Sequence, residues 1–550
     1  MKKYYLLFFG CLISIAALSQ TLTVSTSQLN FGIVSENNPD SLSLTIYNNI
    51  GKTVLVSDIK FFKIYGAPAF SASLSNFYIN DGFSQTIWIK FSPSHNIYHN
   101  SELVIENDGH RGPVSVDLLG QGHYSKSYYN TTQNLAEEAL KTEIKNVTGA
   151  NYNSMGYNSG RDTMFMIIDN QKLNGQGASQ NTLECVYTGR LAVGYIDRTD
   201  CQNNDQFNTE HTWPQSLFSS AEPMKSDLHH LFPTDDVANN TRANYPFGMV
   251  TNASWTNGGS KFDNNTNIFE PRNQHKGETA RAMMYFVLRY QNYSNFMDSQ
   301  EAVLKTWNKT FLPTSVEIKR NNDIKLYQQN LNPFVDYPQF ADRINSISTL
   351  STAPVDFRLQ KFDSIIDYGI VGTGGFLYDY SFIIVNDGNQ PLQLSNFVLS
   401  NTSLFNITSG GSNYTLPPGE SFKTVITLTT GSSVSTVNET LTFNTNSPSS
   451  PTVQVPIKAN IVVLDVAEIN NTGIIVFPNP ATDHINVSCT KQEDLKFTIT
   501  NELGQPVQIE QSKNYNSYNI NLQTITSGFY ILSAVGDKGT VYKQKIIKQE

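Results

Sequence analysis

Alternating apolar and polar positions dominate two long stretches of the chain, and such alternation is typical of β-strands with one buried face. In the first stretch SLSLTIYNN follows FGIV at residues 31–34, and in the second YDYSFIIVNDG follows YGIV at residues 368–371. Each copy places an aromatic-Gly turn before an alternating strand that ends near Asn. Gly, Asn, Ser and Pro punctuate the rest. The repeat predicts two related β-sandwiches, at residues 22–122 and 354–464.

The segment between these stretches has a helical period instead. LAEEALKTEIKNV and GETARAMMYFVLRYQ carry apolar residues three or four positions apart, and the run from Glu301 to Trp307 indicates a third helix. Together with shorter strand-like runs, these helices predict an α+β domain at residues 125–350.

The end of the chain, residues 470–550, carries a separate signature. VFPNP at residues 476–480 confines the chain to a turn, because proline fixes its own φ. Short alternating strands follow, with SGFYI at residues 527–531 and a terminal VYKQKIIKQE. We expect a small β-sandwich here.

The first residues form the pattern of an export signal. Two lysines, a short apolar run and the small-residue motif Ala17-Leu18-Ser19 predict a secretory signal peptide over residues 1–19. No later stretch is apolar enough to span a membrane, so we expect no transmembrane helix in the mature chain. Export would permit a disulfide between Cys185 and Cys201, which the sequence leaves open.

Composition narrows the classes of function. The 550 residues are 39% hydrophobic and 15% charged, which excludes a wholly disordered chain. The formal net charge of −9 excludes a globally basic nucleic-acid binder. Any contact with a polyanion must therefore come from a local patch or from a metal.

The densest cluster of chemically active residues lies in the middle segment. It has three blocks: residues 207–216, which end in EHTWPQS, DLHHLFP at residues 227–233, and residues 234–244, which end in NNTRAN. The first two blocks predict strands joined by a loop. The third predicts a helix, because Thr234 can cap it and two acids follow in its first turn.

These residue types suit hydrolysis of a phosphodiester. Glu210 and Asn239 could each give an oxygen to a hard cation such as Mg²⁺, which prefers oxygen ligands and keeps several waters. His211, neutral near pH 7, could take a proton from the attacking water. Arg242, three residues after Asn239 on the same helix face, could pair with a phosphate. Neighbouring strand residues point to opposite faces, so Glu210 and His211 share a site only if the strand ends or bends there.

The three blocks, in this order and spacing, resemble the bacterial endonuclease I family of secreted nucleases, which have the ββα-metal or His-Me finger fold. The resemblance covers residues 128–345. It includes CVYTG at 185–189, the FEP, KG, ARA and Y run within 269–285, WN at 307–308 and NP at 332–333. It implies a secreted, largely nonspecific endonuclease that cuts DNA, with RNA as a further substrate, and leaves 5′-phosphate ends. The implied cofactor is Mg²⁺, with other divalent metals as alternatives.

The family's roles are carried over onto matching positions. The resemblance implies that Glu210 is a metal ligand and that His211 is the general base. Asn239 is implied as the second metal ligand, with Asn244 as the alternative if the register differs. Arg242 is implied as the catalytic arginine.

Further residues receive supporting roles from the same resemblance. Asp227 and His229 are expected beside the site, in support of the fold or of the hydrated metal. Glu270 is either structural or a second acid near the metal. The family's arginine in the loop after the EH pair has no clear match, and Lys225 is the residue that could replace it.

The flanking segments resemble modules of exported proteins. The two repeats resemble bacterial immunoglobulin-like domains, expected to be spacers or adhesion modules without chemistry of their own. Residues 470–550 resemble the C-terminal sorting domain of the Bacteroidetes type IX secretion system. This implies contact with that machinery and a secreted or cell-surface protein.

Two other functions remain open from the sequence. One is a surface adhesin whose nuclease-like domain is inactive, and the other is a phosphodiesterase acting on small molecules. The sequence does not decide between DNA and RNA, between single and double strands, or between release and anchoring, and it does not identify the metal or any ligand of the immunoglobulin-like modules.

Overall fold

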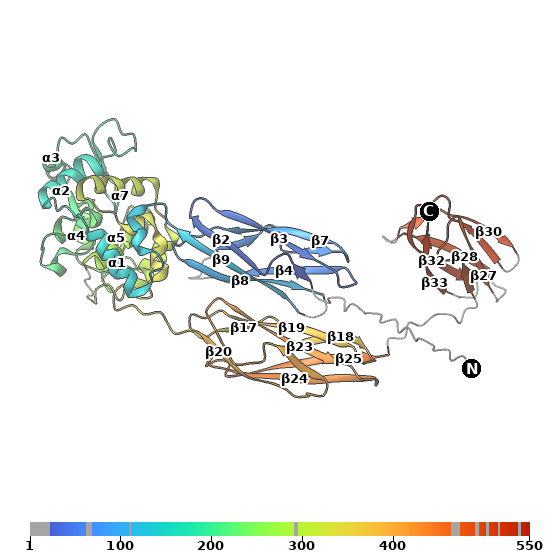
Figure 1. The fold of residues 1–550 in the computed structure, drawn as a ribbon. Helices are drawn as coiled ribbons and strands as arrows, with labels where there is room; N and C mark the ends of the chain where they lie inside the picture. Colours follow the sequence, from blue (N-terminus) through green and yellow to red (C-terminus); the bar gives the residue numbers. More distant parts are fainter. Residues whose placement is uncertain are drawn as a thin grey trace, which may run out of the picture. The chain divides into compact units, whose positions relative to one another are not determined.

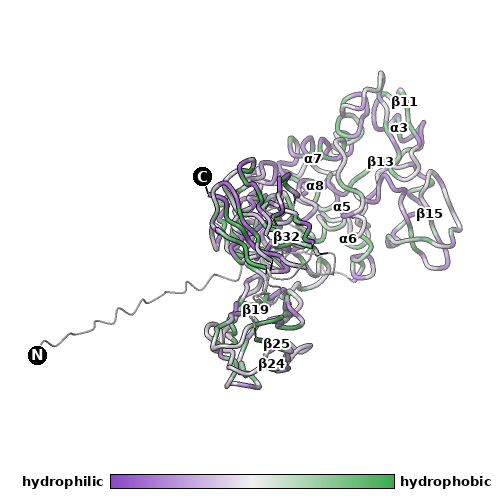
Figure 2. The backbone as a smooth tube through the Cα atoms, turned by 90° about the vertical axis from the view of Figure 1, so that its right-hand side faces the viewer, coloured by the Kyte–Doolittle hydropathy of each residue, from purple (hydrophilic) through white to green (hydrophobic). Residues whose placement is uncertain are grey.

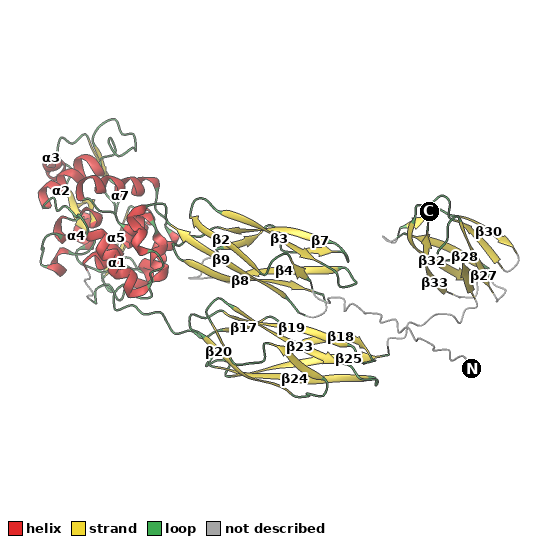
Figure 3. Ribbon diagram, in the orientation of Figure 1, coloured by secondary structure: helices red, strands yellow, loops and turns green. Residues whose placement is uncertain are grey.

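The computed structural model describes residues 22–61, 69–109, 112–290, 295–463, 474–489, 494–501, 505–514, 517–536 and 541–549. The predicted signal peptide, residues 1–19, lies outside them. The chain divides into two compact units, Met1–Ile461 and Val462–Glu550. Figure 3 shows the helices gathered in one part of the first unit, whereas the other parts are built of strands.

The first sandwich packs two antiparallel-rich sheets around an apolar core that includes Leu44, Ile87 and Leu103 (Figure 1). One sheet has the order β1 (Thr23–Val24), β3 (Asp40–Tyr47), β7 (Ser84–Phe91), β5 (Phe70–Ala72). The other has the order β2 (Gln28–Ser35), β9 (Val114–His123), β8 (Tyr98–Asn107), β4 (Val54–Phe61), β6 (Phe77–Ile79). The β2–β9 pair is parallel.

The second sandwich has the same two-sheet plan, with a core that includes Ile384, Ile426 and Leu441. One sheet has the order β17 (Leu359–Lys361), β19 (Leu377–Asn386), β23 (Ser421–Thr429), β21 (Phe405–Ser409). The other has the order β18 (Ile366–Gly372), β25 (Thr452–Val462), β24 (Ser435–Thr445), β20 (Leu392–Leu399), β22 (Tyr414–Leu416).

The predicted repeat has a structural basis in one asparagine of each sandwich. Asn48 is buried and donates to the carbonyls of Lys52 and Ile79, both at 2.7 Å. Asn386 is buried and donates to the carbonyls of Gln390 and Leu416, both at 2.8 Å. The equivalent bonds show that each Asn ends its strand by tying two neighbouring turns together.

The glycines of the two repeated turns also match. Gly32 and Gly369 both have φ near +63°, a conformation that glycine adopts without steric cost. Both N–H groups donate to the side chain two residues earlier, Asn30 in one copy and Asp367 in the other. The aromatic-Gly pair is therefore a turn signal, as the sequence predicted.

The central domain, from Ser127 to Arg343, is built around α5 (Asn273–Tyr290), most of whose residues are buried. The other helices among the described residues are η1 (Ser127–Thr132), α1 (Glu137–Gly149), α2 (Tyr157–Thr163), η2 (Met164–Ile168), α3 (Arg198–Asn204), η3 (Gln215–Phe218), η4 (Met224–Ser226), η5 (Leu228–His230), α4 (Asp236–Arg242), α6 (Glu301–Thr310), α7 (Ser315–Gln328), α8 (Pro333–Asp336) and η6 (Pro338–Arg343). The strands form a pair β10 (Thr182–Glu184) and β11 (Leu191–Val193), a pair β12 (Phe207–His211) and β13 (Leu231–Asp235), and a meander β14 (Trp255–Asn257), β15 (Ser260–Asp263), β16 (Ile268–Glu270). The predicted fold class, an α+β domain flanked by β-sandwiches, is confirmed.

Two local predictions in this domain are wrong. The block at 227–233 does not form one strand, because Asp227 first caps a 3₁₀ turn, η5 (Leu228–His230), and β13 begins only at Leu231. Thr234 does not cap α4, because the helix begins at Asp236 and the residue directly before it is Asp235. The cap is Asp235, whose carboxylate accepts from the Ala238 N–H at 2.8 Å.

The second unit is a third sandwich of eight strands. One sheet has the order β26 (Ile474–Phe477), β27 (His484–Cys489), β31 (Ser517–Asn521), β30 (Glu510–Asn514), and the other has the order β29 (Pro506–Val507), β28 (Leu495–Thr500), β32 (Gly528–Gly536), β33 (Val541–Lys548). Its core includes Ile485, Ile520 and Leu532. Figure 2 shows hydrophobic and hydrophilic positions interleaved along the backbone, as expected of elements with one buried face. Among the described residues, no helix combines the length and the apolar character that a bilayer crossing requires.

Candidate active site

A strand pair and a helix bring the first and third sequence blocks together. β12 and β13 pair antiparallel, with Glu210 opposite Phe232 and His211 opposite Leu231. α4 begins directly after β13, where Asp235 caps it. β12 ends at His211, which meets the condition under which neighbouring strand residues can face one site.

Glu210 is held by two donors inside the domain. Its side chain is 1% exposed, and its Oε1 accepts a hydrogen bond of 2.7 Å from the Tyr187 hydroxyl. Arg242 Nη1 lies 3.4 Å from the same oxygen. Burial, with the Glu210 charge beside it, raises the pKa of Tyr187 well above its ordinary value, so this hydroxyl remains a donor.

His211 is fixed in one tautomer by the loop between the strands. Its Nε2 lies 3.1 Å from the Lys225 carbonyl oxygen, and a carbonyl can only accept, so Nε2 carries the proton. Nδ1 then keeps its lone pair, and no described residue hydrogen-bonds to it. Burial, with a smaller effect of His230, lowers the pKa of His211 to about 3. The ring is therefore a neutral imidazole with one free basic nitrogen.

Arg242 lies inside the protein. Its side chain is 1% exposed and donates to the backbone carbonyls of His211 at 3.3 Å, Thr212 at 2.7 Å and Ala243 at 3.0 Å. Its guanidinium also lies 4.5 Å from the centre of the Phe247 ring. These contacts tie the end of β12 to α4, and the phosphate-binding role remains a prediction.

Asn239 and Asn244 lie at different places on the third block. Asn239 is half-buried within α4, three residues before Arg242 and on the same side of the helix. Asn244 is exposed and follows Ala243, whose φ of +49° ends the helix. The pairing of Asn239 with Glu210, with Asn244 as the alternative, stays a prediction.

Asp227 is the centre of a buried polar network. It accepts from the hydroxyls of Tyr285 and Tyr290, both at 2.8 Å, and from Gln328 Nε2 at 3.0 Å. Burial opposes its charge, but the neighbouring histidines and these donors outweigh burial and lower its pKa. Asp227 thereby shapes the loop that presents the Lys225 carbonyl to His211.

His229, Glu270 and His230 are held in separate buried contacts. His229 Nε2 lies 3.3 Å from the Asn330 carbonyl. Glu270 pairs with Lys276 Nζ at 2.6 Å and accepts from the Val250 N–H. His230 packs its ring on His211 at 5.6 Å. Of the three, only His230 touches the general-base candidate, and a direct role for His229 or Glu270 remains a prediction.

The disulfide that the sequence left open is absent. Cys185 and Cys201 are both free and buried. The Cys185 sulfur accepts from the Asp235 N–H at 3.2 Å, beside the cap of α4. Burial raises the pKa of Cys201 to about 12, so its thiol stays protonated.

Sequence reasoning missed a pair of side chains beside His211. Tyr157 lies with its ring centre 5.6 Å from that of His211, and the Arg161 guanidinium lies 4.3 Å from the centre of the Tyr157 ring. An aromatic residue and an arginine four positions apart on a helix form such a contact readily, so YNSGR was the available signal. Tyr187 gave no comparable signal, because its contact with Glu210 is made across the fold.

The oxygen ligands near His211 suit a hard cation that takes few of its ligands from the protein. Among the described residues, no group of three or more His, Cys, Asp and Glu side chains is arranged to hold a metal. Glu210 and Asn239 offer one carboxylate and one amide oxygen source. Mg²⁺ accepts such a pair, because it keeps several of its waters.

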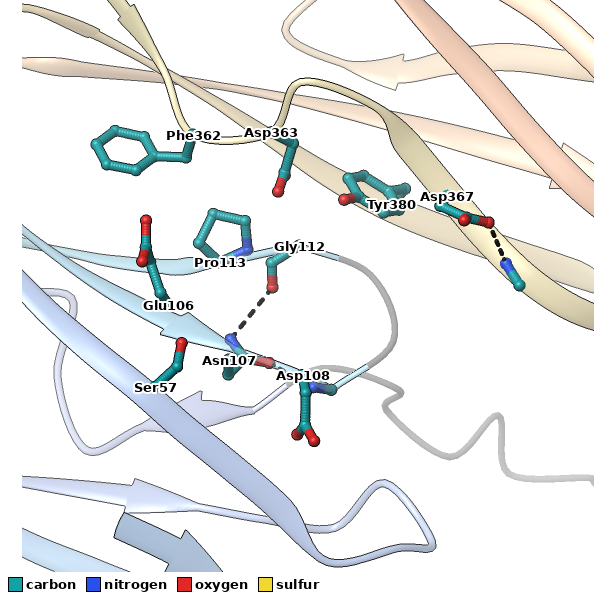
Figure 4. A pocket seen from close by; sticks show the side chains of 12 residues that line it. Ser57, Glu106, Asn107, Asp108, Gly112, Pro113, Phe362, Asp363, Asp367 and Tyr380 are labelled. Atoms are coloured by element: carbon teal, nitrogen blue, oxygen red, sulfur yellow. Dashed lines mark hydrogen bonds between the residues drawn. The ribbon is translucent and has the colours of Figure 1, made fainter. Parts of the chain in front are cut away.

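A separate pocket of about 490 Å³ is lined by residues of both sandwiches (Figure 4). Glu106 and Asp108 reach it from the first sandwich, and Asp363 and Asp367 from the second. Burial raises the pKa of Asp363 to about 6. Among the described residues that line this pocket there is no histidine, lysine or arginine.

Comparison with known families divides the chain in the same places. Residues 132–339 match the Endonuclease I family, and residues 475–549 match the Secretion system C-terminal sorting domain. Both resemblances expected from the sequence are thereby confirmed at the level of domains.

Individual relatives cover the central domain alone. An extracellular ribonuclease of Bacillus subtilis is 32% identical over 160 residues, which is 26% of this chain and 55% of that protein. Endonuclease-1 of Buchnera aphidicola subsp. Baizongia pistaciae is 27% identical over 166 residues, or 26% of this chain and 67% of that protein. The chain therefore spans little more than half the length of the first of these relatives.

Similarity to solved structures is weak. Titin Ig tandem domains A164-A165 align with 35% of this chain and 97% of their own length, at 10% identity and a TM-score of 0.13. A score this low carries no argument, so the description of the sandwiches rests on their strand pairing.

Proposed function

We propose that this chain, with an Endonuclease I domain at residues 132–339 and a secretion-system sorting domain at residues 475–549, is an exported, metal-dependent endonuclease. Its substrate would be DNA, with RNA as the second candidate because the similar Bacillus subtilis protein is named an extracellular ribonuclease.

The tautomer of His211 is the observation that carries this proposal. Its Nε2–H points to the Lys225 carbonyl, so the basic Nδ1 is the nitrogen available to a water molecule. A neutral, buried imidazole of fixed orientation can take a proton from a water that attacks phosphorus. Its low pKa keeps it in the basic form throughout the neutral range.

Glu210 and Asn239 would hold the cation, and Mg²⁺ is the metal whose preference they match. When bound, the cation would stabilise negative charge on the phosphate and the leaving oxygen. Tyr187 and Arg242 orient Glu210 from inside the domain. Arg242 also fixes the His211 backbone, so one arginine sets the spacing between the proposed base and the proposed ligand.

The sorting domain supports an extracellular destination for this activity. A type IX system would export the chain, and the exported protein would be either released or retained at the cell surface. Polymeric nucleic acid outside the cell is a substrate of matching location.

Cleavage of supercoiled plasmid and of a structured RNA by the mature chain tests the proposal. We expect cleavage with MgCl₂ and none with EDTA, and 5′-phosphate ends on the products. His211→Ala should lose the activity, while His484→Ala, an exposed histidine of the second unit, should retain it.

Two outcomes would overturn the proposal. If the wild-type chain cut neither polymer with any divalent metal but hydrolysed bis(p-nitrophenyl) phosphate, the small-molecule phosphodiesterase would be favoured. If it turned over none of these compounds, the inactive, adhesive module would be favoured instead.

A further inference from the structure

Two cations from distant parts of the sequence share one aromatic ring beside His211. Arg161, on α2, places its guanidinium carbon 4.3 Å from the centre of the Tyr157 ring. Lys225, in the turn η4 (Met224–Ser226), places its Nζ 4.7 Å from the same centre. Cation–π attraction of this kind holds a positive charge in place at a partly desolvated site.

The ring also positions both cations relative to the general-base candidate. Tyr157 packs on His211 with an angle of 32° between the ring planes. The backbone carbonyl of Lys225 accepts the His211 Nε2 proton, so Lys225 and His211 are joined through the main chain as well. Any movement of the Tyr157 ring or of the Lys225 backbone would therefore move the His211 imidazole.

Neither cation has a carboxylate partner in the described part of the chain. Arg161 Nη2 donates to the Asn158 side-chain oxygen at 2.9 Å, and its Nε is buried without a hydrogen bond. The neighbouring Arg198, by contrast, is paired with Asp162 at 2.6 Å. Arg281, which is buried, is likewise paired, with Glu317 at 2.6 Å.

Arg161 and Lys225 are both only partly buried, so an anion can reach their positive charges from solvent. Burial, aided by the repulsion from Arg198, already lowers the pKa of Arg161. A phosphate group has the complementary charge, and the guanidinium fork matches its oxygens.

We propose that Arg161 and Lys225, held on the face of Tyr157, bind the backbone phosphate of a nucleic-acid strand that lies nearest to His211. The proposal rests on the proposed function for the identity of the ligand. It gives the negatively charged chain a local cationic contact for a polyanion. It also assigns Tyr157 as a positioning residue, which carries the two cations without touching the substrate.

Binding can be measured without cleavage. The probe is a short fluorescein-labelled DNA duplex in EDTA, followed by anisotropy over a series of NaCl concentrations. We expect Arg161→Ala and Lys225→Ala each to weaken binding several-fold and to reduce the slope of log K against log salt by about 0.9, the value for one lost phosphate contact on duplex DNA. The double variant should lose about twice that slope.

The charge-matched control is Lys319→Ala. Lys319 is 43% exposed on α7 and pairs with Asp323 at 2.5 Å, so its loss should leave the slope unchanged. Arg161→Lys should restore the slope but not the full affinity, because the charge returns without the fork. Tyr157→Leu should lower the affinity for the DNA duplex, whereas Tyr157→Phe should bind as the wild type does, because the cations contact the ring and not the hydroxyl.

An unchanged salt slope in the double variant, with native thermal unfolding, would overturn the proposal. A slope lost equally in Lys319→Ala would overturn it too, since binding would then follow total charge. The outcome is separable from that of the proposed function. If the wild-type chain cuts nucleic acid and the double variant keeps the wild-type salt slope, the phosphate site is wrong and the proposed function stands. A chain that never cuts but loses slope in the variants would retain the phosphate site.

Discussion

The interiors of the sandwiches and of the central domain differ in what they bury. Within the described residues, the first sandwich buries one carboxylate, Glu102, and no Lys or Arg, and the second buries none of these. The central domain buries charged side chains throughout: Lys141, Glu210, Asp227, Asp235, Arg242, Asp263, Glu270, Lys276, Arg281, Glu317, Arg320 and Arg343.

The sandwiches are stabilised by apolar packing, whereas the central domain also buries the charged groups that the proposed chemistry needs. The sandwiches follow from alternation, because an apolar face is enough to specify a packed sheet. Burying charge costs free energy unless each group is paired, and an apolar replacement is often as stable. The central domain accepts that cost in pairs such as Arg242 with Glu210, which lie where the proposed chemistry occurs.

The largest effect should come from breaking a buried pair away from the site. Arg281 donates to both carboxylate oxygens of Glu317 at 2.6 Å. Arg281→Met should lower the free energy of unfolding of the central domain by about 3–5 kcal/mol, because Glu317 is left buried and unpaired. Calorimetry should show this transition moving while those of the sandwiches stay. Arg358→Met, in an exposed pair of the second sandwich, should cost below about 1 kcal/mol.

The next largest effect should be catalytic and without a change in fold. His211→Ala should reduce kcat/KM for plasmid cleavage by about 10²–10⁴-fold, the usual scale for a lost general base. The chain should remain folded but unfold at a lower temperature, because the buried ring also packs on Tyr157 and His230. Full activity in this variant would remove His211 from the mechanism.

The sandwiches offer a matched pair of smaller effects. Asn48→Ala and Asn386→Ala should each lower the free energy of unfolding by about 1–3 kcal/mol, because one buried and one part-buried carbonyl lose their donor in each case. Equal losses, measured by denaturant unfolding of each variant, are expected from equal bonds. A loss in one variant alone would show that the two copies use this position differently.

The smallest effect should come from the hydroxyl behind Glu210. Tyr187→Phe removes one hydrogen bond of 2.7 Å and keeps the packing, so stability should fall by about 1 kcal/mol. The Mg²⁺ concentration needed for half-maximal cleavage should rise several-fold, because the carboxylate is less well oriented. Binding of Mn²⁺, followed by calorimetric titration, should weaken in parallel. An unchanged metal requirement would reduce Tyr187 to a packing role.

The sequence predicted what is encoded locally. The repeat at Gly32 and Gly369, the helical middle segment and the EH pair at the end of a strand all depend on short-range pattern. The strand predicted at 227–233 failed because Asp227 forms a local cap, which competes with strand pairing. The cap of α4 was predicted at Thr234, one residue too early, because strand pairing in β13 continues through Asp235 and delays the start of the helix.

Contacts across the fold could not be predicted in this way. Tyr187 meets Glu210 from a loop that precedes β12, and Lys225 meets Tyr157 from a turn far along the chain. The burial of Arg242 was equally hidden, because a helical position gives the face and not the depth. The sequence thus named the residues around the base but not what holds them.

The free thiols of the central domain bear on where such a protein could work. Cys185 and Cys201 are enclosed, and the shape of the domain depends on hydrogen bonds and ion pairs instead of a covalent crosslink. Its folding would need no oxidant and no disulfide isomerase, and reducing agents would have no disulfide between Cys185 and Cys201 to break. The domain should tolerate oxygen-free, sulfide-rich surroundings as readily as aerated water.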